Sequence, residues 1–470
     1  MPVKKICCLC YGRAGMAIST VVAVICPEIR VTVVLPNAEQ VLQCNANQFS
    51  PFLYGANFID YMRKCHNRNL FFTTNINASI IEADLIILVS DSEMKTYGDG
   101  KEQMVDLTQI QEMANLIAAH SESNKIIVES SNIPYRSAEC IREILNSNKL
   151  PEVEFQVLSI PSFYDEGCSF GSLLEPELVL IGVEDTPETA IAVKELTIIF
   201  ERWIDPERVY IGNERLVELG KLFIRAVIAQ RLTNVFALAA VCEKVGANFL
   251  HVMKVISNDP RIGFHPKNIP FNLEDFSRVV STLTHVADSV QLSRLSEYWR
   301  EVYEMFKYHY SQFTTKLTYP PNGNLRNRRL ALFGFACYTQ TKESKGSVAI
   351  DIAKYILEAG GQVNIYDPNV NDVEVVDALL EAGCQVPKEN LKKVLNVHHS
   401  PKEALLDCET LIVCIGRPEI VNVKFGNLYN LMCKPAYLFD YGNILDHNNL
   451  LKIGFNVRTI GKSAEKTSFR

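Results

Sequence analysis

Two separate series of short apolar segments, each alternating with helical patterns, constrain the fold of this chain more than any other feature. In the first series, residues 6–9 form a strand pattern, residues 17–26 are helix-like, and residues 31–35 form a second strand pattern. This order is a βαβ opening, which is typical of a parallel sheet. Further apolar strand candidates follow at residues 85–89, 125–128, 153–158 and 178–181. The first part of the chain therefore predicts a doubly wound α/β sheet.

The second series begins at Leu330 with the strand pattern LALFGFA, after a basic stretch rich in Pro, Asn and Gly at residues 319–329. It continues with a helix from Val348 and a strand at residues 362–366. Apolar runs at residues 411–415 and 437–439 complete it. These segments predict a second doubly wound sheet, with residues 319–329 at its boundary.

Long helical patterns lie between the two series. At residues 218–245, and again at 283–313, apolar residues recur at helical spacing over runs too long for helices that only connect strands. We therefore predict an α/β protein with two Rossmann-like doubly wound sheets joined by a central helical domain. The expected boundaries are residues 1–213 for the first Rossmann domain, 214–318 for the helical domain, 319–329 for a linker and 330–470 for the second Rossmann-like domain.

Composition limits the possible binding partners and the cellular compartment of the protein. A net charge of -7 disfavours a general nucleic-acid binder or an anionic-membrane binder. No run approaches 18 uninterrupted apolar residues, and the start MPVKKICCLC has no small-residue cleavage site, so neither a membrane span nor a signal peptide is expected. The 14 cysteines are scattered singly through apolar runs, which suits reduced thiols in the cytoplasm. The histidines lack metal-ligand spacing, so we predict no metal site.

The first glycine turn is a degenerate dinucleotide fingerprint. A Rossmann G-x-G-x-x-G motif needs its three glycines for the tight turn, for close approach to pyrophosphate and for helix packing. Here those positions hold Cys10, Gly12 and Gly15. The second strand ends in Leu35, where an acidic residue would bind the adenosine ribose hydroxyls. A leucine accepts no hydrogen bond, so NAD affinity should fall by about two decades or more.

Several collinear segments resemble the UDP-glucose 6-dehydrogenase family. They are PEIRVTVV at 27–34, NLFFTTNI at 69–76, KTYGDGK at 95–101, AQRLTNVFALAAVCEKVGAN at 229–248, DPRIG at 259–263, IYDP at 365–368 and VRTIGK at 457–462. The resemblance implies an NAD-binding Rossmann unit, a helical dimer core and a UDP-binding Rossmann-like unit, often assembled into hexamers. It also implies two successive hydride transfers to NAD through a cysteine-bound intermediate, giving UDP-glucuronate.

The resemblance breaks at the position of the nucleophile. The family motif G-F-G-G-S-C-F-x-K-D aligns with PFNLEDFSRV, which places Asp275 where the family has its catalytic cysteine. No cysteine lies between Cys242 and Cys337, so a small shift of register would not restore one. Val279 stands at the aspartate of the Lys-Asp pair that follows the cysteine.

The other family positions are a mixture of losses and matches. Among catalytic positions, Lys221 matches the catalytic lysine, Glu166 persists, and Ser162 replaces the acid-base glutamate. The cofactor positions are Gly12, Gly15, Asn132 at a threonine near the nicotinamide, and Lys345 at a pyrophosphate-binding arginine. The candidate substrate contacts are Phe163, Arg261 and Lys267.

Sequence reasoning therefore predicts a paralogue that keeps the family architecture without its activity. Oxidising an aldehyde at such a site requires a nucleophile that adds to the carbonyl and later leaves, which a thiolate does and a carboxylate does poorly. We expect a binding, scaffold or regulatory role as a homodimer or higher homo-oligomer, or in a hetero-oligomer with an active relative. The alternative is a residual NAD-dependent oxidoreductase or a UDP-sugar binder, with NAD bound weakly or not at all.

Overall fold

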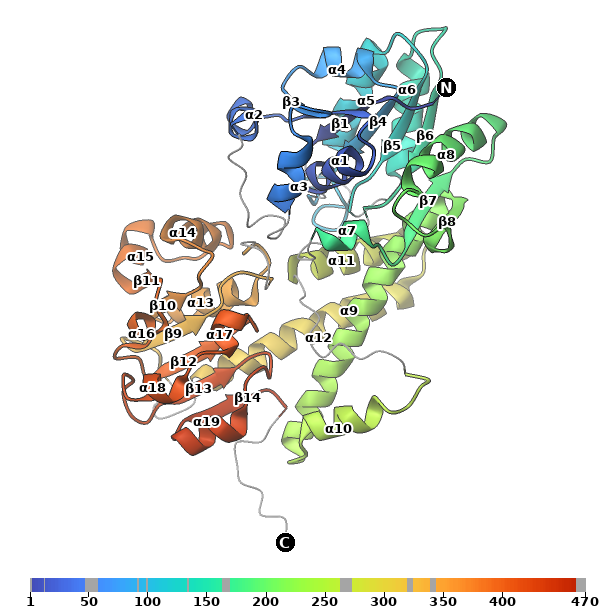
Figure 1. The fold of residues 1–470 in the computed structure, drawn as a ribbon. Coiled ribbons are helices and arrows are strands. Elements are labelled where there is room, and N and C mark those ends of the chain that lie inside the picture. The colour runs from blue at the N-terminus through green and yellow to red at the C-terminus, as the bar shows by residue number, and fades with distance from the viewer. Residues whose placement is uncertain are drawn as a thin grey trace. The chain divides into compact units, whose positions relative to one another are not determined.

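Two parallel-dominated sheets organise the protein (Figure 1). The computed structural model describes residues 2–11, 13–46, 58–90, 93–98, 100–132, 135–162, 170–262, 273–318, 324–338 and 344–461. The chain divides into two compact units, one made of Met1–Ala226 with Ser281–Ser289 and the other of Val227–Val280 with Val290–Arg470. Each unit contains one sheet, which confirms the predicted fold class.

The first unit contains an eight-stranded sheet in the order β3-β2-β1-β4-β5-β6-β7-β8. Its neighbouring strands pair in parallel except β6 and β7, which are antiparallel. The strands are β1 Lys5–Cys10, β2 Arg30–Val34, β3 Leu70–Thr73, β4 Leu85–Val89, β5 Lys125–Glu129, β6 Phe155–Ser159, β7 Val179–Val183 and β8 Val209–Asn213.

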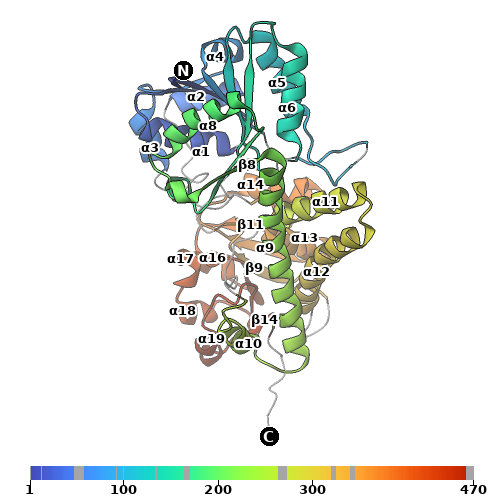
Figure 2. The same ribbon diagram turned by 90° about the vertical axis from the view of Figure 1, so that its right-hand side faces the viewer.

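Helices cover both faces of this sheet because its central strands are apolar on both sides. One buried cluster joins Cys8, Val31 and Ile87 to α1 and α8, and another joins Leu9, Ile86 and Ile127 to α5 and α6. Helices α5 and α6 lie side by side, as Figure 2 shows. The helices before the central region are α1 Arg13–Ile25, α2 Ala38–Asn45, α3 Phe58–Cys65, α4 Ile76–Glu82, α5 Thr108–His120, α6 Ser137–Asn148, α7 Gly171–Leu174 and α8 Pro187–Phe200, with a short 3-10 turn at Pro206–Arg208.

The second unit contains a six-stranded sheet in the order β11-β10-β9-β12-β13-β14, with every neighbouring pair parallel. The strands are β9 Arg329–Phe333, β10 Gln362–Tyr366, β11 Leu395–His398, β12 Thr410–Val413, β13 Tyr437–Asp440 and β14 Asn456–Thr459. Its helices are α13 Val348–Glu358, α14 Asp372–Glu381, α15 Lys388–Val394, α16 Pro401–Leu405, α17 Pro418–Val421, α18 Phe425–Tyr429 and α19 His447–Ile453.

The central helices are α9 Glu214–Lys244, α10 Phe249–Ile256, α11 Leu273–Ser289 and α12 Ser293–Leu317. The continuous helical run expected over residues 283–313 is wrong, because the chain breaks between α11 and α12. Gln291 adopts a left-handed φ of 61° at that break. Among the described helices, α9 alone is long and apolar enough to span a membrane by length and composition, a test that the core helix of a soluble domain also passes.

The end of β14 is held against the central helices of the second unit. Glu243 of α9 accepts a hydrogen bond from the Gly461 amide at 3.3 Å and forms an ion pair with Lys316 of α12. The Gly461 carbonyl accepts from the Phe249 amide at 3.3 Å. A Cβ atom at Gly461 would lie 2.8 Å from Phe249 Cβ, so this close approach requires glycine. Residues 457–461 thereby join the second sheet to α9, α10 and α12.

Candidate functional site

The first candidate region lies at the carboxyl ends of β5 and β6, where doubly wound sheets place their ligands. Ser162 is buried, and its amide donates to the Ser131 carbonyl at 3.1 Å, so the loops carrying Ser162 and Asn132 are joined. The structure thus brings together two of the predicted site residues. Glu166 and Phe163 lie outside the described residues.

A buried carboxyl group that the sequence reasoning missed sits at the base of these loops. Glu129 ends β5, is fully buried, and accepts a hydrogen bond from the Ser131 amide at 2.9 Å. Burial, with a smaller contribution from the nearby Glu218 carboxyl, raises the pKa of Glu129 to about 7, although hydrogen bonding with Ser131 and Ser137 opposes the shift. The feature of the sequence that could have identified this residue is the single acid at the end of the apolar strand KIIVE.

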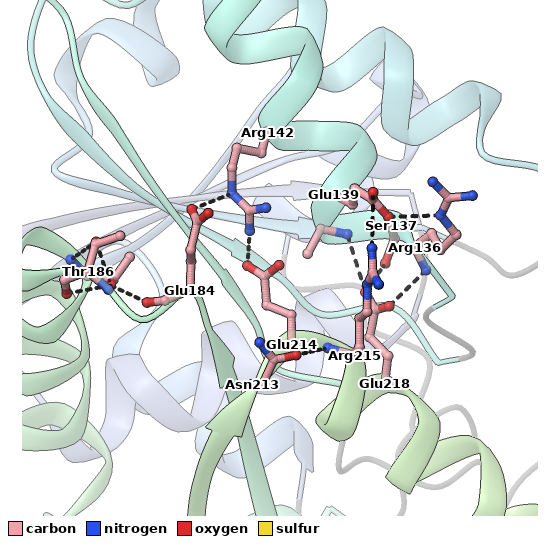
Figure 3. A network of polar contacts seen from close by, with 12 residues as sticks. Arg136, Ser137, Glu139, Arg142, Glu184, Thr186, Asn213, Glu214, Arg215 and Glu218 are labelled. Atoms are coloured by element: carbon pink, nitrogen blue, oxygen red, sulfur yellow. Dashed lines mark hydrogen bonds and ion pairs between the residues drawn. The ribbon is translucent and has the colours of Figure 1, made fainter.

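Glu218, near the beginning of α9, is a second buried carboxyl group, and it caps the start of α6 (Figure 3). Glu218 accepts hydrogen bonds from the amides of Arg136 at 2.8 Å and Ala138 at 3.4 Å, and from the Ser137 hydroxyl at 3.3 Å. Arg136 itself has a left-handed φ of 57° and makes no side-chain cap. Glu218 therefore satisfies orphan amides at the start of α6, although it lies about 80 residues further along the chain.

An ion-pair network extends from the same turn of α9 (Figure 3). Glu214 pairs with Arg142 of α6, and Arg142 Nε also lies 3.3 Å from Glu184 after β7. Burial raises the pKa of Glu214, and the Arg142 guanidinium opposes that shift. Lys221, the match to the family's catalytic lysine, follows on α9 and is partly buried. The first turns of α9 therefore anchor the helix to the first sheet beside the candidate site.

The glycine turn of the first sheet keeps its packing role. Cys10 is buried, and a Cβ atom at Gly15 would lie 2.7 Å from Cys10 Sγ and 3.0 Å from Cys8 Sγ. The Cys10 side chain therefore occupies space between β1 and α1. Leu35 follows β2, is buried, and offers no acceptor. Gly12 lies outside the described residues. These residues suit a βα turn, but they do not supply the ribose contact of an NAD site.

The second candidate region contains Asp275, which the family resemblance places at the nucleophile position. Asp275 lies in the first turn of α11 and is partly buried. The adjacent Glu274 pairs with Arg278 one turn later. Glu274 Oε1 also lies 3.4 Å from Nζ of Lys345, the residue at the predicted pyrophosphate position. Because Glu274 directly precedes Asp275, this ion pair places Lys345 near Asp275.

Of the predicted substrate contacts, Arg261 alone lies within the described residues. Arg261 is exposed and pairs with Asp259 at 2.6 Å, two residues earlier in the chain. Lys267 lies outside the described residues. Among the residues that the structure describes, no group of three or more His, Cys, Asp or Glu side chains is suited to a metal ion.

The fold and these two regions define a dinucleotide-binding type of α/β protein with a second Rossmann-like sheet. Sequence profiles of the UDP-glucose/GDP-mannose dehydrogenase family match at residues 4–204 for the NAD binding domain, 215–306 for the central domain and 331–447 for the UDP binding domain. The chain belongs to this family.

Individual relatives agree with that assignment. The chain is 35% identical over 465 residues to UDP-glucose 6-dehydrogenase of Drosophila melanogaster, which covers 98% of this chain and 97% of the relative. The corresponding rat protein is 34% identical over 464 residues, covering 98% and 94%. The predicted family resemblance is therefore confirmed.

Solved structures show the same fold at lower identity. A UDP-glucose dehydrogenase from Pyrobaculum islandicum superposes with a TM-score of 0.76 at 18% identity, covering 96% of this chain and 98% of the other. A UDP-D-ManNAc dehydrogenase from Pyrococcus horikoshii gives a TM-score of 0.77 at 15% identity, covering 98% and 100%.

The α6–α9 network generates a prediction about stability. Arg142→Met should lower the free energy of unfolding by about 2–4 kcal/mol at about pH 8, because it leaves the buried Glu214 without its cation. The pKa of Glu214 is raised by burial and should rise further in the variant. A carboxyl group whose pKa is higher in the folded state loses stability as pH rises through that interval, so the loss should be smaller at about pH 5. Urea unfolding at both pH values measures this.

Arg215→Met is the matched control, since Arg215 is 77% exposed and contacts only the rim of the network through Glu139. It should change the free energy of unfolding by less than about 0.5 kcal/mol at either pH. Equal losses in the two variants would show that the pairing with Glu214 contributes nothing specific.

Proposed function

We propose that this protein is a UDP-glucose 6-dehydrogenase-like protein without dehydrogenase activity, which acts as a binding, scaffold or regulatory partner through its assembly. The proposal rests mainly on which residues occupy the first turn of α11. The resemblance places Asp275 at the nucleophile there, and no cysteine occurs from residue 243 to residue 336. Removing a covalent nucleophile typically costs about three or more decades in turnover.

The neighbouring residues support the same reading. Val279, at the position of a family aspartate, is buried, and its side chain carries no group that polarises water. Ser162 stands at the position of an acid-base glutamate and lacks a carboxyl group. A carboxylate at Asp275 would also place negative charge beside a developing alkoxide, which raises the barrier instead of lowering it.

The cofactor and substrate positions favour weak nucleotide binding. Leu35 supplies no acceptor for the ribose hydroxyls of NAD. At the pyrophosphate position, Lys345 already has a carboxylate partner in Glu274. A nucleotide phosphate would have to compete with this internal anion for the same ammonium group. We infer that NAD binds weakly or not at all and that any UDP-sugar binds without turnover.

Residual NAD-dependent oxidation of UDP-glucose to UDP-glucuronate is the second candidate function. It is favoured by the near full-length identity of 35% to a named UDP-glucose 6-dehydrogenase and by the retained Lys221. The missing nucleophile argues against it, and a turnover measurement separates the two candidates.

The proposed role depends on assembly with another protein chain. Several apolar side chains of α9 are exposed in the single chain, namely Leu216, Phe223, Ile224, Val227 and Val241, each at least 42% exposed. Exposed apolar side chains at helical spacing favour a partner surface. A two-fold contact is self-complementary, so it needs no catalytic residue. We propose a homodimer through residues 215–315, or a hetero-oligomer with an active relative, in the cytoplasm.

The catalytic prediction is that purified protein supplied with NAD and UDP-glucose forms no NADH above background. The Asp275→Cys variant should remain inactive, because Ser162, Val279 and Leu35 still lack the family's groups. Absorbance of NADH over hours measures both. Steady turnover of the unmodified chain at even about a thousandth of an active relative's rate would establish the residual enzyme instead.

The cofactor prediction concerns affinity. NAD should bind no tighter than about millimolar, since the ribose carboxylate is absent at Leu35. Calorimetric titration measures the dissociation constant, and an active relative from the same family serves as the positive control. Binding in the low micromolar range would contradict the role assigned to Leu35.

The assembly prediction uses light scattering at micromolar concentration. The unmodified chain should have at least twice the 52.9 kDa mass of one chain. Phe223→Glu should dissociate it while leaving the circular dichroism spectrum unchanged, because it places a charge within the apolar contact. Leu42→Glu is the control, since Leu42 is equally apolar and 69% exposed on α2. Dissociation by both variants, or by neither, would show that the interface is not formed by α9.

A further inference from the structure

Glu129 is buried without a counter-charge. It is fully buried in the first unit, and Oε1 accepts the Ser131 amide at 2.9 Å. Its other oxygen, Oε2, has no hydrogen-bond partner among the described residues. The charged neighbour with the largest effect on it is Glu218, which is also an acid. An ionised carboxylate in such surroundings is costly unless a positive charge joins it.

The basic groups nearby are already paired with other acids. On α6, Arg142 pairs with Glu214 and Glu184. Arg136, before α6, pairs through Nε with Glu139, and Arg215 of α9 also contacts Glu139. Glu218 is stabilised by the first amides of α6 and by the partial positive charge of that helix end. Beside Glu129, Ser131 and Ser137 oppose the rise in its pKa through hydrogen bonding, but neither supplies a positive charge.

Further buried oxygen atoms on or next to these strand ends have no hydrogen-bond partner among the described residues. Ser159 is the register partner of Glu129 on the adjacent parallel strand β6, so the two side chains lie on the same face of the sheet. Ser159 is fully buried, and its Oγ has no partner in the described part of the chain. In the turn after Glu129, Oδ1 of Asn132 is a further buried acceptor for which the described residues provide no donor.

These observations favour a small cation over a proton. A proton on Glu129 would neutralise the carboxylate, but it would supply a hydrogen bond to one acceptor only. A hard cation binds several oxygen ligands at once, including carboxylate, amide and hydroxyl oxygens. Divalent and transition metals prefer more carboxylate, His or Cys ligands than this cluster offers, in accord with the lack of such groups among the described residues.

We infer that Glu129, Ser159 and Asn132 form an internal binding site for one monovalent alkali cation, Na⁺ or K⁺, at the carboxyl ends of β5 and β6. The cation neutralises Glu129 beside Glu218 and holds the β5 and β6 ends under the start of α6. The site is structural, and it does not depend on whether the protein turns over UDP-glucose.

Thermal unfolding of the full chain at about pH 8.5 tests the inference, because Glu129, with a pKa of about 7, is then ionised and its charge is uncompensated unless a cation is bound. The melting temperature is compared in sodium, potassium and choline chloride at one ionic strength. Binding to the folded state alone should raise it by about 2–4 °C in sodium or potassium relative to choline. Equal melting temperatures in the three salts would overturn the proposal.

Two variants locate the effect. Glu129→Gln should abolish the difference between salts, and it should melt higher than the unmodified chain in choline because it removes the buried charge. Glu184→Gln is the matched control, because Glu184 is 54% exposed and pairs with Arg142 at the rim of the network. It should keep the difference between salts. A difference that survives unchanged in Glu129→Gln would place the cation elsewhere and overturn the assignment.

A pH series in choline distinguishes the proton from the metal ion. Burial raises the pKa of Glu129 to about 7, so without a cation the folded state should gain stability as the pH falls from about 8.5 to about 6. Sodium or potassium should flatten that dependence. If the pH dependence is the same in all three salts, Glu129 holds a proton and the cation proposal is wrong. In crystals soaked with rubidium chloride, an anomalous peak at Glu129 Oε2 is expected, and its absence would count against the site.

Discussion

The contact of Glu218 with the start of α6 is the interaction on which the arrangement of the first unit depends. It is a carboxyl group on a long helix that caps another helix, and it fixes where α9 leaves the first sheet. The neighbouring Gly182 permits this approach, because a Cβ atom there would lie 2.9 Å from Glu214 Cα. Charge pairing and the absence of a side chain therefore act together at one turn of α9.

The contacts of Glu218, Glu214 and Arg142 involve none of the residues that the resemblance places at catalytic positions. The contacts of Glu218, Glu214 and Arg142 contribute to the stability of the fold whether or not a substrate binds. Selection for a folded, assembling protein therefore acts on them directly, whereas a nucleophile is maintained only by selection for turnover. Under the proposed function, this difference accounts for 35% identity to a UDP-glucose 6-dehydrogenase over nearly the full length, alongside Asp275 at the position that the resemblance assigns to the nucleophile.

The sequence predicted the strands whose apolar runs stand between clear turn residues. Residues 85–89 and 362–366 were assigned with the bounds that β4 and β10 have in the structure. Strand β8 was missed because its sequence VYIGN is largely exposed and lacks an apolar run. The break between α11 and α12 was missed because Gln291, with neither glycine nor proline at its position, takes the left-handed conformation there. Local patterns do not report such tertiary effects.

The candidate site was predictable only where family motifs mark it. The positions of Asp275, Lys221 and Ser162 came from alignment with those motifs. The pairing of Arg142 with Glu214 joins residues 72 apart, and no local pattern indicates it. The contact between Glu274 and Lys345 could not be predicted either, because no sequence pattern indicates that an acid and a base so far apart in the chain form a pair.

The packing of Cys10 beside Gly15 has a consequence for evolutionary reversal. The thiol fills the space between β1 and α1, so a return to glycine at position 10 would open a void in a packed interior before it improved any nucleotide site. Glu274 similarly has Lys345 and Arg278 as partners, and its replacement would leave two cations to be accommodated. Placing the family's residues at these positions would therefore require several coordinated substitutions, and single substitutions would carry a cost in stability.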